Sequence, residues 1–203
     1  MKLVESSVRG ARAAFDPNAE AVALESFEAM ATGTREDFER LIAADWVNHE
    51  AVDEPPAARQ SHGPAACEAT ALWLRAAFSE LRWEINDVVA ERDLVVAHTT
   101  MKGRQTGDFV AYGPDAQIEE VFPPTHREFA CTQTHWMRVT AGRMSEHWAS
   151  RDDFGMARQL GWAPPSPSYL VRMQVARMRA RRRARRRPRS IVMQNAASAP
   201  WIP

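Results

Sequence analysis

The stretch from Arg127 to Gly161, REFACTQTHWMRVTAGRMSEHWASRDDFGMARQLG, holds the residues that decide the fold. Two alternating runs flank the turn at residues 140–143, which predicts a β-hairpin followed by a short closing helix. Because successive side chains of a strand point to opposite faces, the first strand gathers five on one face. These five residues are Phe129, Cys131, Gln133, His135 and Met137.

The second strand of the hairpin places its side chains on two opposite faces. One face carries Met144, Glu146, Trp148, Ser150 and Asp152, and the other carries Ser145, His147, Ala149 and Arg151. We expect the face with Trp148 and Asp152 to lie beside Gln133 and His135. One hairpin then aims an imidazole, an amide, an indole and a carboxylate into the same hollow, which is a grouping typical of a binding or catalytic site.

Length and composition predict an ordinary globular protein. The chain has 203 residues and a hydrophobic share of 45%, enough for one domain with extensions. Its two cysteines, Cys67 and Cys131, have no metal-type spacing, which favours a reducing compartment. No apolar run reaches the length of a membrane span, and no secretory leader opens the sequence. We therefore expect a cytoplasmic protein without a membrane segment.

The zero net charge conceals a division of the chain into an acidic body and a basic tail. Ten of the 26 basic residues, all arginines, follow residue 162, which leaves residues 1–162 with 16 basic against 26 acidic side chains. We predict an N-terminal extension at 1–16, a domain at 17–162 that folds by itself, and a disordered Arg-rich tail at 163–203. Such a tail can bind nucleic acid or another anionic surface, although a run of solvated arginines is the commoner case.

Hydrophobic spacing organises the rest of the chain. It predicts helices over residues 17–30, 34–42 and 63–79 and strands over 83–90 and 94–102, with an extended piece at 46–49 and loops at 53–62 and 103–126. This order favours an α+β fold with a curved antiparallel sheet of about four strands and helices packed on its concave side. Such a cone-shaped barrel has an open end that forms a natural ligand pocket.

Several short motifs occur in an order that resembles a known family. They are Asn48-His49, His62-Gly63-Pro64, Gly103-Arg104-Gln105-Thr106-Gly107, Pro123-Pro124-Thr125, and residues 146–152 (EHWASRD) running into Gln159-Leu160-Gly161. On these motifs the chain resembles the SnoaL-like polyketide cyclases of the nuclear-transport-factor-2-like superfamily, over roughly residues 20–162.

The resemblance implies a function. Characterised members close rings of polyketide esters by intramolecular aldol condensation without a metal or organic cofactor. It implies that Asp152 is the acid/base, with His135 as a second catalytic residue. It also implies that the substrate-binding positions include Asn48, His49, Gln133 and Trp148. A bulky apolar substrate and a homodimer formed through the outer sheet face are further expectations from the resemblance.

An aldol closure needs a base that removes a proton next to a carbonyl group and donors that stabilise the enolate. A carboxylate with an ordinary pKa of about 3.9 is a weak base unless an apolar pocket raises that pKa, which Trp148 could do for Asp152. Gln133, His135 and Asn48 could then donate hydrogen bonds to the developing oxyanion.

Alternatives remain open for the single residues and for the function. Asp152 could instead cap the closing helix, and His135 could be a satisfied core histidine. His98 could line the cavity, whereas His126 and His147 are expected to be structural or exposed. The six histidines show no HxH or HExxH spacing, so we expect no metal site. The rival functions are a non-catalytic ligand-binding module and a hydrolase or hydroxylase on the same fold.

Overall fold

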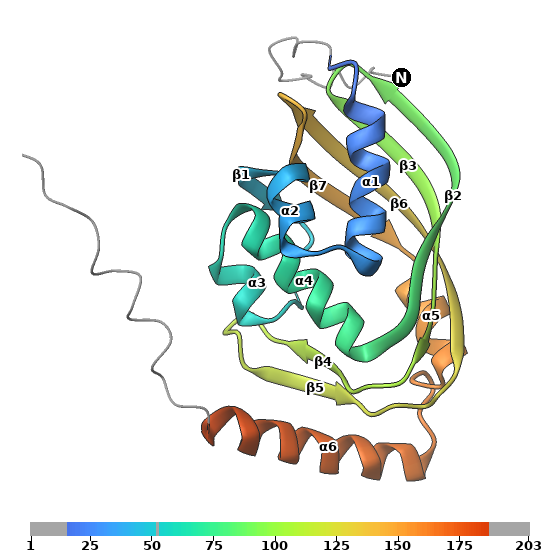
Figure 1. Cartoon of the computed structure of the whole chain (residues 1–203). Coiled ribbons are helices and arrows are strands. Elements are labelled where there is room, and N and C mark those ends of the chain that lie inside the picture. Colours follow the sequence, from blue (N-terminus) through green and yellow to red (C-terminus); the bar gives the residue numbers. More distant parts are fainter. Residues whose placement is uncertain (1–15, 52, 187–203) are drawn as a thin grey trace, which may run out of the picture.

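The computed structural model describes residues 16–51 and 53–186, which form one curved sheet flanked by helices (Figure 1). The helices are α1 (Ala19–Thr32), α2 (Arg35–Leu41), α3 (Pro56–Gln60), α4 (Gly63–Ala77), α5 (Asp153–Leu160) and α6 (Pro167–Arg186). The strands are β1 (Ile42–Asn48), β2 (Phe78–Glu91), β3 (Leu94–Gln105), β4 (Phe109–Tyr112), β5 (Ile118–Phe122), β6 (Glu128–Thr140) and β7 (Arg143–Arg151). None of the described helices is long and apolar enough to cross a membrane.

The main sheet has five strands in the order β1-β7-β6-β3-β2. Neighbours β2, β3, β6 and β7 pair antiparallel, whereas β1 runs parallel to β7. The predicted α+β class and curved sheet are therefore confirmed. The sheet is mixed, has one strand more than expected, and is open at its edges, so the cone is not a closed barrel.

Helices α1, α2 and α4 cover the concave face of the sheet (Figure 1). Alternation on β3 and β6 turns Val95 and Met137 inward, where they belong to one buried cluster with Phe27 of α1 and Phe38 of α2. The start of α2 is fixed by a capping box between Thr34 and Asp37. The core thus lies between the helices and the sheet, and the cavity described below is left inside it.

The segment expected to be a long loop, residues 103–126, contains regular structure. Strand β3 continues to Gln105, and β4 and β5 then form a separate two-stranded hairpin. The buried Gln105 side chain holds this hairpin: its Nε2 donates to the carbonyl of Phe122 at 2.9 Å, and its Oε1 accepts from Trp162 Nε1 at 3.1 Å. The expected loop at 53–62 likewise contains the short helix α3.

The prediction of a disordered tail is wrong for the part of it that forms α6. Tyr169 and Met173 of this helix are buried, and Tyr169 Oη donates to the carbonyl of Pro123 at 2.9 Å. Arg181 donates to the carbonyl of Ile118 in β5. Helix α6 therefore covers the β4-β5 hairpin (Figure 1). The rest of the predicted tail, residues 187–203, and residues 1–15 of the predicted extension lie outside the described residues.

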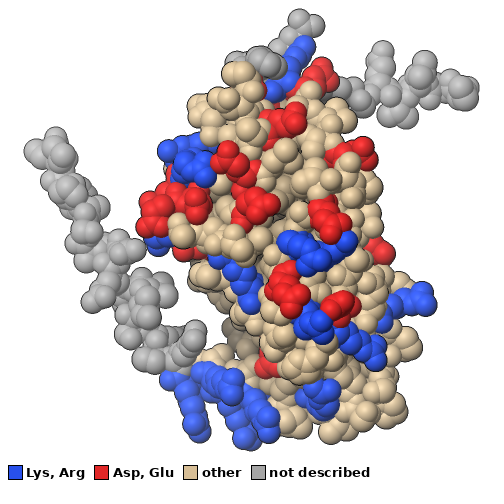
Figure 2. Space-filling model, turned by 45° about the vertical axis from the view of Figure 1, so that its right-hand side comes forward, with Lys and Arg blue, Asp and Glu red and all other residues tan. Residues whose placement is uncertain are grey.

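The division of charge is visible in space. Figure 2 shows basic side chains gathered at the lower end of the molecule, where α6 lies, and acidic and basic side chains interspersed over the rest of this face. The exposed arginines of α6 include Arg179, Arg182, Arg183, Arg185 and Arg186. The described part of the chain thus keeps the basic helix apart from most of the acidic surface.

Candidate active site

A β-bulge decides which side chains of β7 face the interior. Val139 pairs with Met144 and Arg138 pairs with Glu146, so Ser145 is an extra residue in β7. Beyond this bulge the alternation is inverted, because a shift of one residue moves every side chain to the other face. His147, Ala149 and Arg151 therefore line the interior cavity, and the face carrying Trp148 is turned outward.

The cavity lies between the concave face of the sheet and the helices and has a volume of about 290 Å³. Most of its wall is apolar, with aromatic and methionine side chains from α1, β1, β2, β3, β6 and α5. Representative lining residues are Phe27, Trp46, Trp83, Met101, Met137 and Met156. Pockets with apolar walls and a few converging polar groups are typical of small-molecule sites.

A chain of hydrogen bonds runs along the polar part of this wall, starting at β2. Trp83 Nε1 donates to Gln133 Oε1 at 3.0 Å, and His135 Nε2 lies 2.9 Å from the same oxygen. Gln133 and His135 come from the predicted inward face of β6, and both are buried. The edge of the His135 ring packs against Phe27, with ring centroids 5.0 Å apart.

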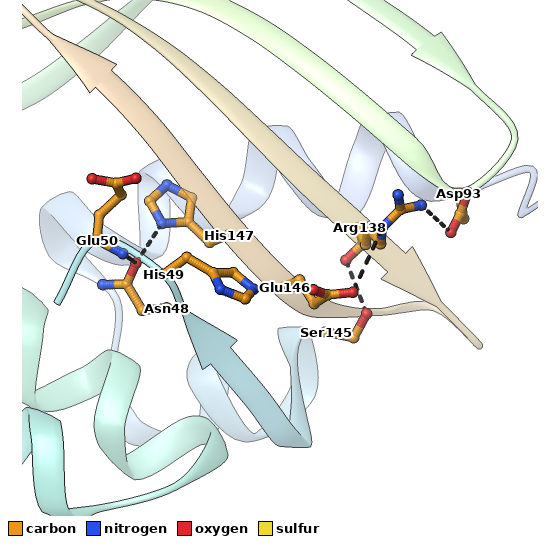
Figure 3. Close-up of polar contacts among 8 residues, drawn as sticks. All are labelled: Asn48, His49, Glu50, Asp93, Arg138, Ser145, Glu146 and His147. Atoms are coloured by element: carbon orange, nitrogen blue, oxygen red, sulfur yellow. Dashed lines mark hydrogen bonds and ion pairs between the residues drawn. The ribbon is translucent and has the colours of Figure 1, made fainter. Parts of the chain in front are cut away.

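The chain continues through His147 to β1 and the loop that follows it. His135 Nδ1 lies 2.9 Å from His147 Nε2. His147 Nδ1 lies 2.9 Å from Asn48 Oδ1 (Figure 3). Asn48 Nδ2 then donates to Glu54 Oε1 at 2.9 Å, and Thr70 donates to the other oxygen of Glu54 at 2.8 Å. Seven side chains from six parts of the chain thus form one continuous network.

Burial perturbs the acid–base properties of this network. Loss of hydration lowers the pKa of His135 well below its usual value, and His147 and Arg151 lower it further. Burial lowers the pKa of His147 to about 4, with additional contributions from Arg151 and His49. The same desolvation raises the pKa of Glu54, which is 5% exposed. Both imidazoles are therefore in the neutral form at neutral pH and can accept a proton.

Charged side chains also line the cavity where β7 gives way to α5. Arg151 Nε lies 3.4 Å from Asp153 Oδ2, and burial raises the pKa of the Asp153 carboxyl. Glu50 and Asp53 line the cavity from the segment after β1. This end of the cavity therefore presents one guanidinium together with several carboxyl groups.

Asp152 is not among the residues that line the cavity. It is the N-cap of α5, and its Oδ1 accepts a hydrogen bond from the Gly155 amide at 2.8 Å. The expectation that Asp152 faces the hollow with Trp148 is wrong, since the bulge at Ser145 turns that face away. Asp153, the first residue of α5, lines the cavity instead.

Three other expected pocket residues also lie outside the cavity lining. Trp148 is on the outer face of β7, and its ring stacks on His49 with centroids 4.4 Å apart. His49 Nε2 lies 3.0 Å from Glu146 Oε2, in a surface network that includes Arg138 (Figure 3). His98 is on the outer face of β3, with Nδ1 lying 3.6 Å from Asp87 Oδ2. Of the predicted set, Asn48, Gln133 and His135 are brought together.

The residues that sequence reasoning missed are His147 and Glu54. From the sequence, His147 is expected to be structural or exposed. Its place in the cavity wall could not be predicted, because the bulge that turns it inward leaves no clear pattern in the sequence. Glu54 lies next to two prolines in an expected loop, and nothing in its neighbours marks a buried carboxylate. Within residues 16–51 and 53–186, no three His, Cys, Asp or Glu side chains gather in a way that could hold a metal ion.

Comparison with known proteins agrees with this architecture. The SnoaL-like polyketide cyclase family matches residues 21–160. The chain belongs to the SnoaL-like polyketide cyclase family. An aklanonic acid methyl ester cyclase of Streptomyces peucetius is 31% identical over 142 residues, which cover 69% of this chain and 88% of the relative. A nogalonic acid methyl ester cyclase of Streptomyces nogalater is 31% identical over 134 residues, covering 66% and 90%.

Two solved structures have the same fold. The structure of IdmH from Streptomyces antibioticus aligns with a TM-score of 0.52 and 28% identity, over 70% of this chain and 98% of that one. The structure of TsrD from Streptomyces laurentii aligns with a TM-score of 0.57 at 21% identity, over 72% and 98%. The aligned shares leave out 28–30% of this chain, whereas nearly all of each neighbour is matched.

Proposed function

We propose that this SnoaL-like protein closes a ring in a polyketide-type carbonyl ester by intramolecular aldol condensation, with His135 as the acid/base. The observation that carries this proposal is the neutral, buried His135 in the wall of an apolar cavity. The names of the two methyl ester cyclase relatives support the same chemistry and substrate class.

The reaction uses one proton and returns it. His135 removes a proton from a carbon that is activated by a neighbouring carbonyl group, which gives an enolate. The enolate carbon attacks a second carbonyl carbon of the same molecule, the new C–C bond forms, and the resulting alkoxide takes the proton back. Asn48 and Gln133 hold the imidazoles in place, and the apolar wall excludes water from the enolate. Substrate and product have the same mass.

The test uses aklanonic acid methyl ester and nogalonic acid methyl ester with mass spectrometry of the products. We expect the wild type to convert at least one of them at constant mass and His135→Ala to lose at least about a hundredfold in rate, as is usual for a missing acid/base. Asp152→Asn is the matched control and should retain turnover. Full activity of His135→Ala would contradict the role of His135.

The same experiment separates the rival functions. A product that gains one oxygen atom indicates a hydroxylase. A product that gains one water by ring opening, or that loses a CH2 unit because methanol leaves the methyl ester, indicates a hydrolase. A ligand that stabilises the protein and is recovered unchanged indicates a binding module.

We propose that the protein is a homodimer formed through the outer face of the sheet. A row of registered side chains crosses this face from Val89 through Val96 and Trp136 to Trp148. Val89 is 67% exposed, and such a contiguous apolar row favours association. Light scattering should give a dimer mass for the wild type and a monomer mass for Trp136→Glu. Leu72→Glu on α4 is the control and should remain dimeric.

We also propose a reducing, cytoplasmic location, which is supported by the two buried free thiols Cys67 and Cys131. A fluorescent fusion of the full chain, followed by fractionation of the host cells, would test this location. Recovery of the fusion outside the cytoplasmic fraction would contradict it.

A further inference from the structure

The two imidazoles at the centre of the network lie between two amide oxygens that can only accept hydrogen bonds. On one side Gln133 Oε1 receives the indole N–H of Trp83, which is a donor only, so this atom must be the amide oxygen. On the other side Asn48 Oδ1 receives the backbone N–H of Glu50 at 3.2 Å (Figure 3). Neither amide can turn without placing two donors against each other.

Three contacts lie in series between the amide oxygens of Gln133 and Asn48. The contacts from Gln133 to His135, from His135 to His147 and from His147 to Asn48 are each 2.9 Å long. Each of the three contacts needs one proton to be a hydrogen bond. Two neutral imidazoles carry only two protons on their four ring nitrogens. The full chain of bonds therefore requires one proton more than the neutral pair holds.

We propose that His135 and His147 act as a single acid–base group that alternates between two and three protons, with Asn48 as the positioning residue that fixes one end of the pair. This proposal rests on the proposed function, in which the third proton comes from the substrate. With two protons, one of the three contacts holds no proton, so two lone pairs face each other there and that contact is repulsive. When the substrate proton arrives, all three contacts become hydrogen bonds.

The arrangement favours the state in which the substrate has lost its proton. Interactions that strengthen as a reaction proceeds lower its barrier, whereas interactions that are equal in both states do not. The third proton gives the pair a positive charge, and Glu54 holds the Asn48 amide oxygen toward the pair by accepting from Asn48 Nδ2 at 2.9 Å. Arg151 on β7 opposes that charge, and burial opposes it as well. The protonated pair is thus a short-lived intermediate that can return its proton to the alkoxide.

Other charged groups near the pair must be considered together with Glu54. His49, which follows β1, lies near His147 and opposes its protonation, and Asp53 lies near Glu54. Glu50 and Asp153 line the same cavity. The elements α1 and α4 contribute only the uncharged Ser26, Thr70 and the Cys67 thiol to the polar part of the lining. Among the described carboxyl groups, only that of Glu54 is joined to the histidines by hydrogen bonds that run through the Asn48 side chain.

Nuclear magnetic resonance of the full chain with ¹⁵N-labelled histidine tests the proposal without needing a substrate. As the pH falls, the ring nitrogens of His135 and His147 should change together with one common midpoint, because they take up a single shared proton. Asn48→Ala should lower this midpoint by roughly one pH unit, since it removes the amide oxygen that accepts the third hydrogen bond. Glu50→Gln is the control. It removes a carboxyl group that lines the same cavity but is not part of the hydrogen-bond network, so it should leave the midpoint unchanged.

Two results would overturn the proposal. One is a titration in which the two rings change at separate midpoints or in which only one ring changes. The other is an equal effect of Asn48→Ala and Glu50→Gln on this midpoint. If the protein turns over a methyl ester substrate, the acidic limb of its kcat/KM profile should shift with Asn48→Ala as the NMR midpoint does. If no substrate is converted, the proposed reaction fails while the titration still decides whether the pair shares a proton.

Discussion

Replacing Asp152 by alanine should lower stability and leave turnover nearly unchanged, because this carboxylate caps α5 and does not line the cavity. Loss of an N-cap of this kind costs about 1 kcal/mol. In a chain of this size, that cost lowers the melting temperature by roughly 2–4 °C. Asparagine accepts the same hydrogen bond, so Asp152→Asn should melt close to the wild type.

The geometry at Gly155 provides an independent check on the cap. A Cβ atom at Gly155 would lie 2.0 Å from Asp152 Oδ2, so alanine cannot be placed there while the carboxylate stays in position. Gly155→Ala should therefore destabilise the wild type, and most of this effect should vanish in the Asp152→Ala background. We expect a coupling free energy of about 1 kcal/mol between the two sites, which is within the usual range for residues in contact.

The assay is urea and thermal unfolding of the wild type, both single variants and the double variant, with turnover measured on the same samples. Additive free energies in this cycle would mean that the Asp152 carboxylate does not lie against Gly155. Loss of turnover in Asp152→Asn at an unchanged melting temperature would refute the structural role and return Asp152 to the chemistry.

Three further predictions concern the hairpin, the last helix and pH. Gln105→Leu should lower the free energy of unfolding in urea by about 3 kcal/mol, because it leaves the Trp162 indole N–H and the Phe122 carbonyl without their partner. A loss below about 1 kcal/mol would contradict this role of Gln105. Tyr169→Phe should lower the free energy of unfolding by about 1 kcal/mol, because it removes the hydrogen bond to Pro123. Deletion of residues 163–203 should lower it by more than about 3 kcal/mol, because it removes the buried side chains of α6. An unchanged melting curve of the deletion would show that α6 is dispensable. The free energy of unfolding should fall as the pH drops from about 6.5 to about 4, because His147 binds a proton in the unfolded chain at these pH values but stays neutral in the folded one. His147→Gln should reduce this dependence of stability on pH.

The sequence predicts well those parts of the fold that depend on periodicity alone. The alternation of β6 places Gln133, His135 and Met137 on one inward face, as expected. The helix over 63–79 is present as α4, and the turn at residues 140–143 joins β6 to β7. In each case the local pattern and the tertiary packing favour the same conformation.

Three expectations failed where a tertiary contact outweighs the local pattern. The loop prediction for 103–126 relied on its glycines, prolines and acidic residues, but the Gln105 side chain and α6 hold a hairpin there. The disordered tail was inferred from its arginines, although Tyr169 and Met173 lie one turn apart and bury together. Glu54 is held in the interior by hydrogen bonds from Asn48 and Thr70 and by the charge of Arg151, partners that its neighbours in the sequence do not reveal.

The error over the faces of β7 has a single cause, the bulge at Ser145, and deleting that residue tests this explanation. Without Ser145, simple alternation from Met144 still turns His147 inward, so the cavity wall keeps its composition. We expect this deletion to melt cooperatively and to retain the shared titration of the two imidazoles. Deletion of Ala149 is the control, because it turns Arg151 outward and pulls Asp152 away from Gly155, and it should be much less stable. A stable Ala149 deletion beside an unfolded Ser145 deletion would mean that the bulge shapes the sheet itself and does more than set which residues face the cavity.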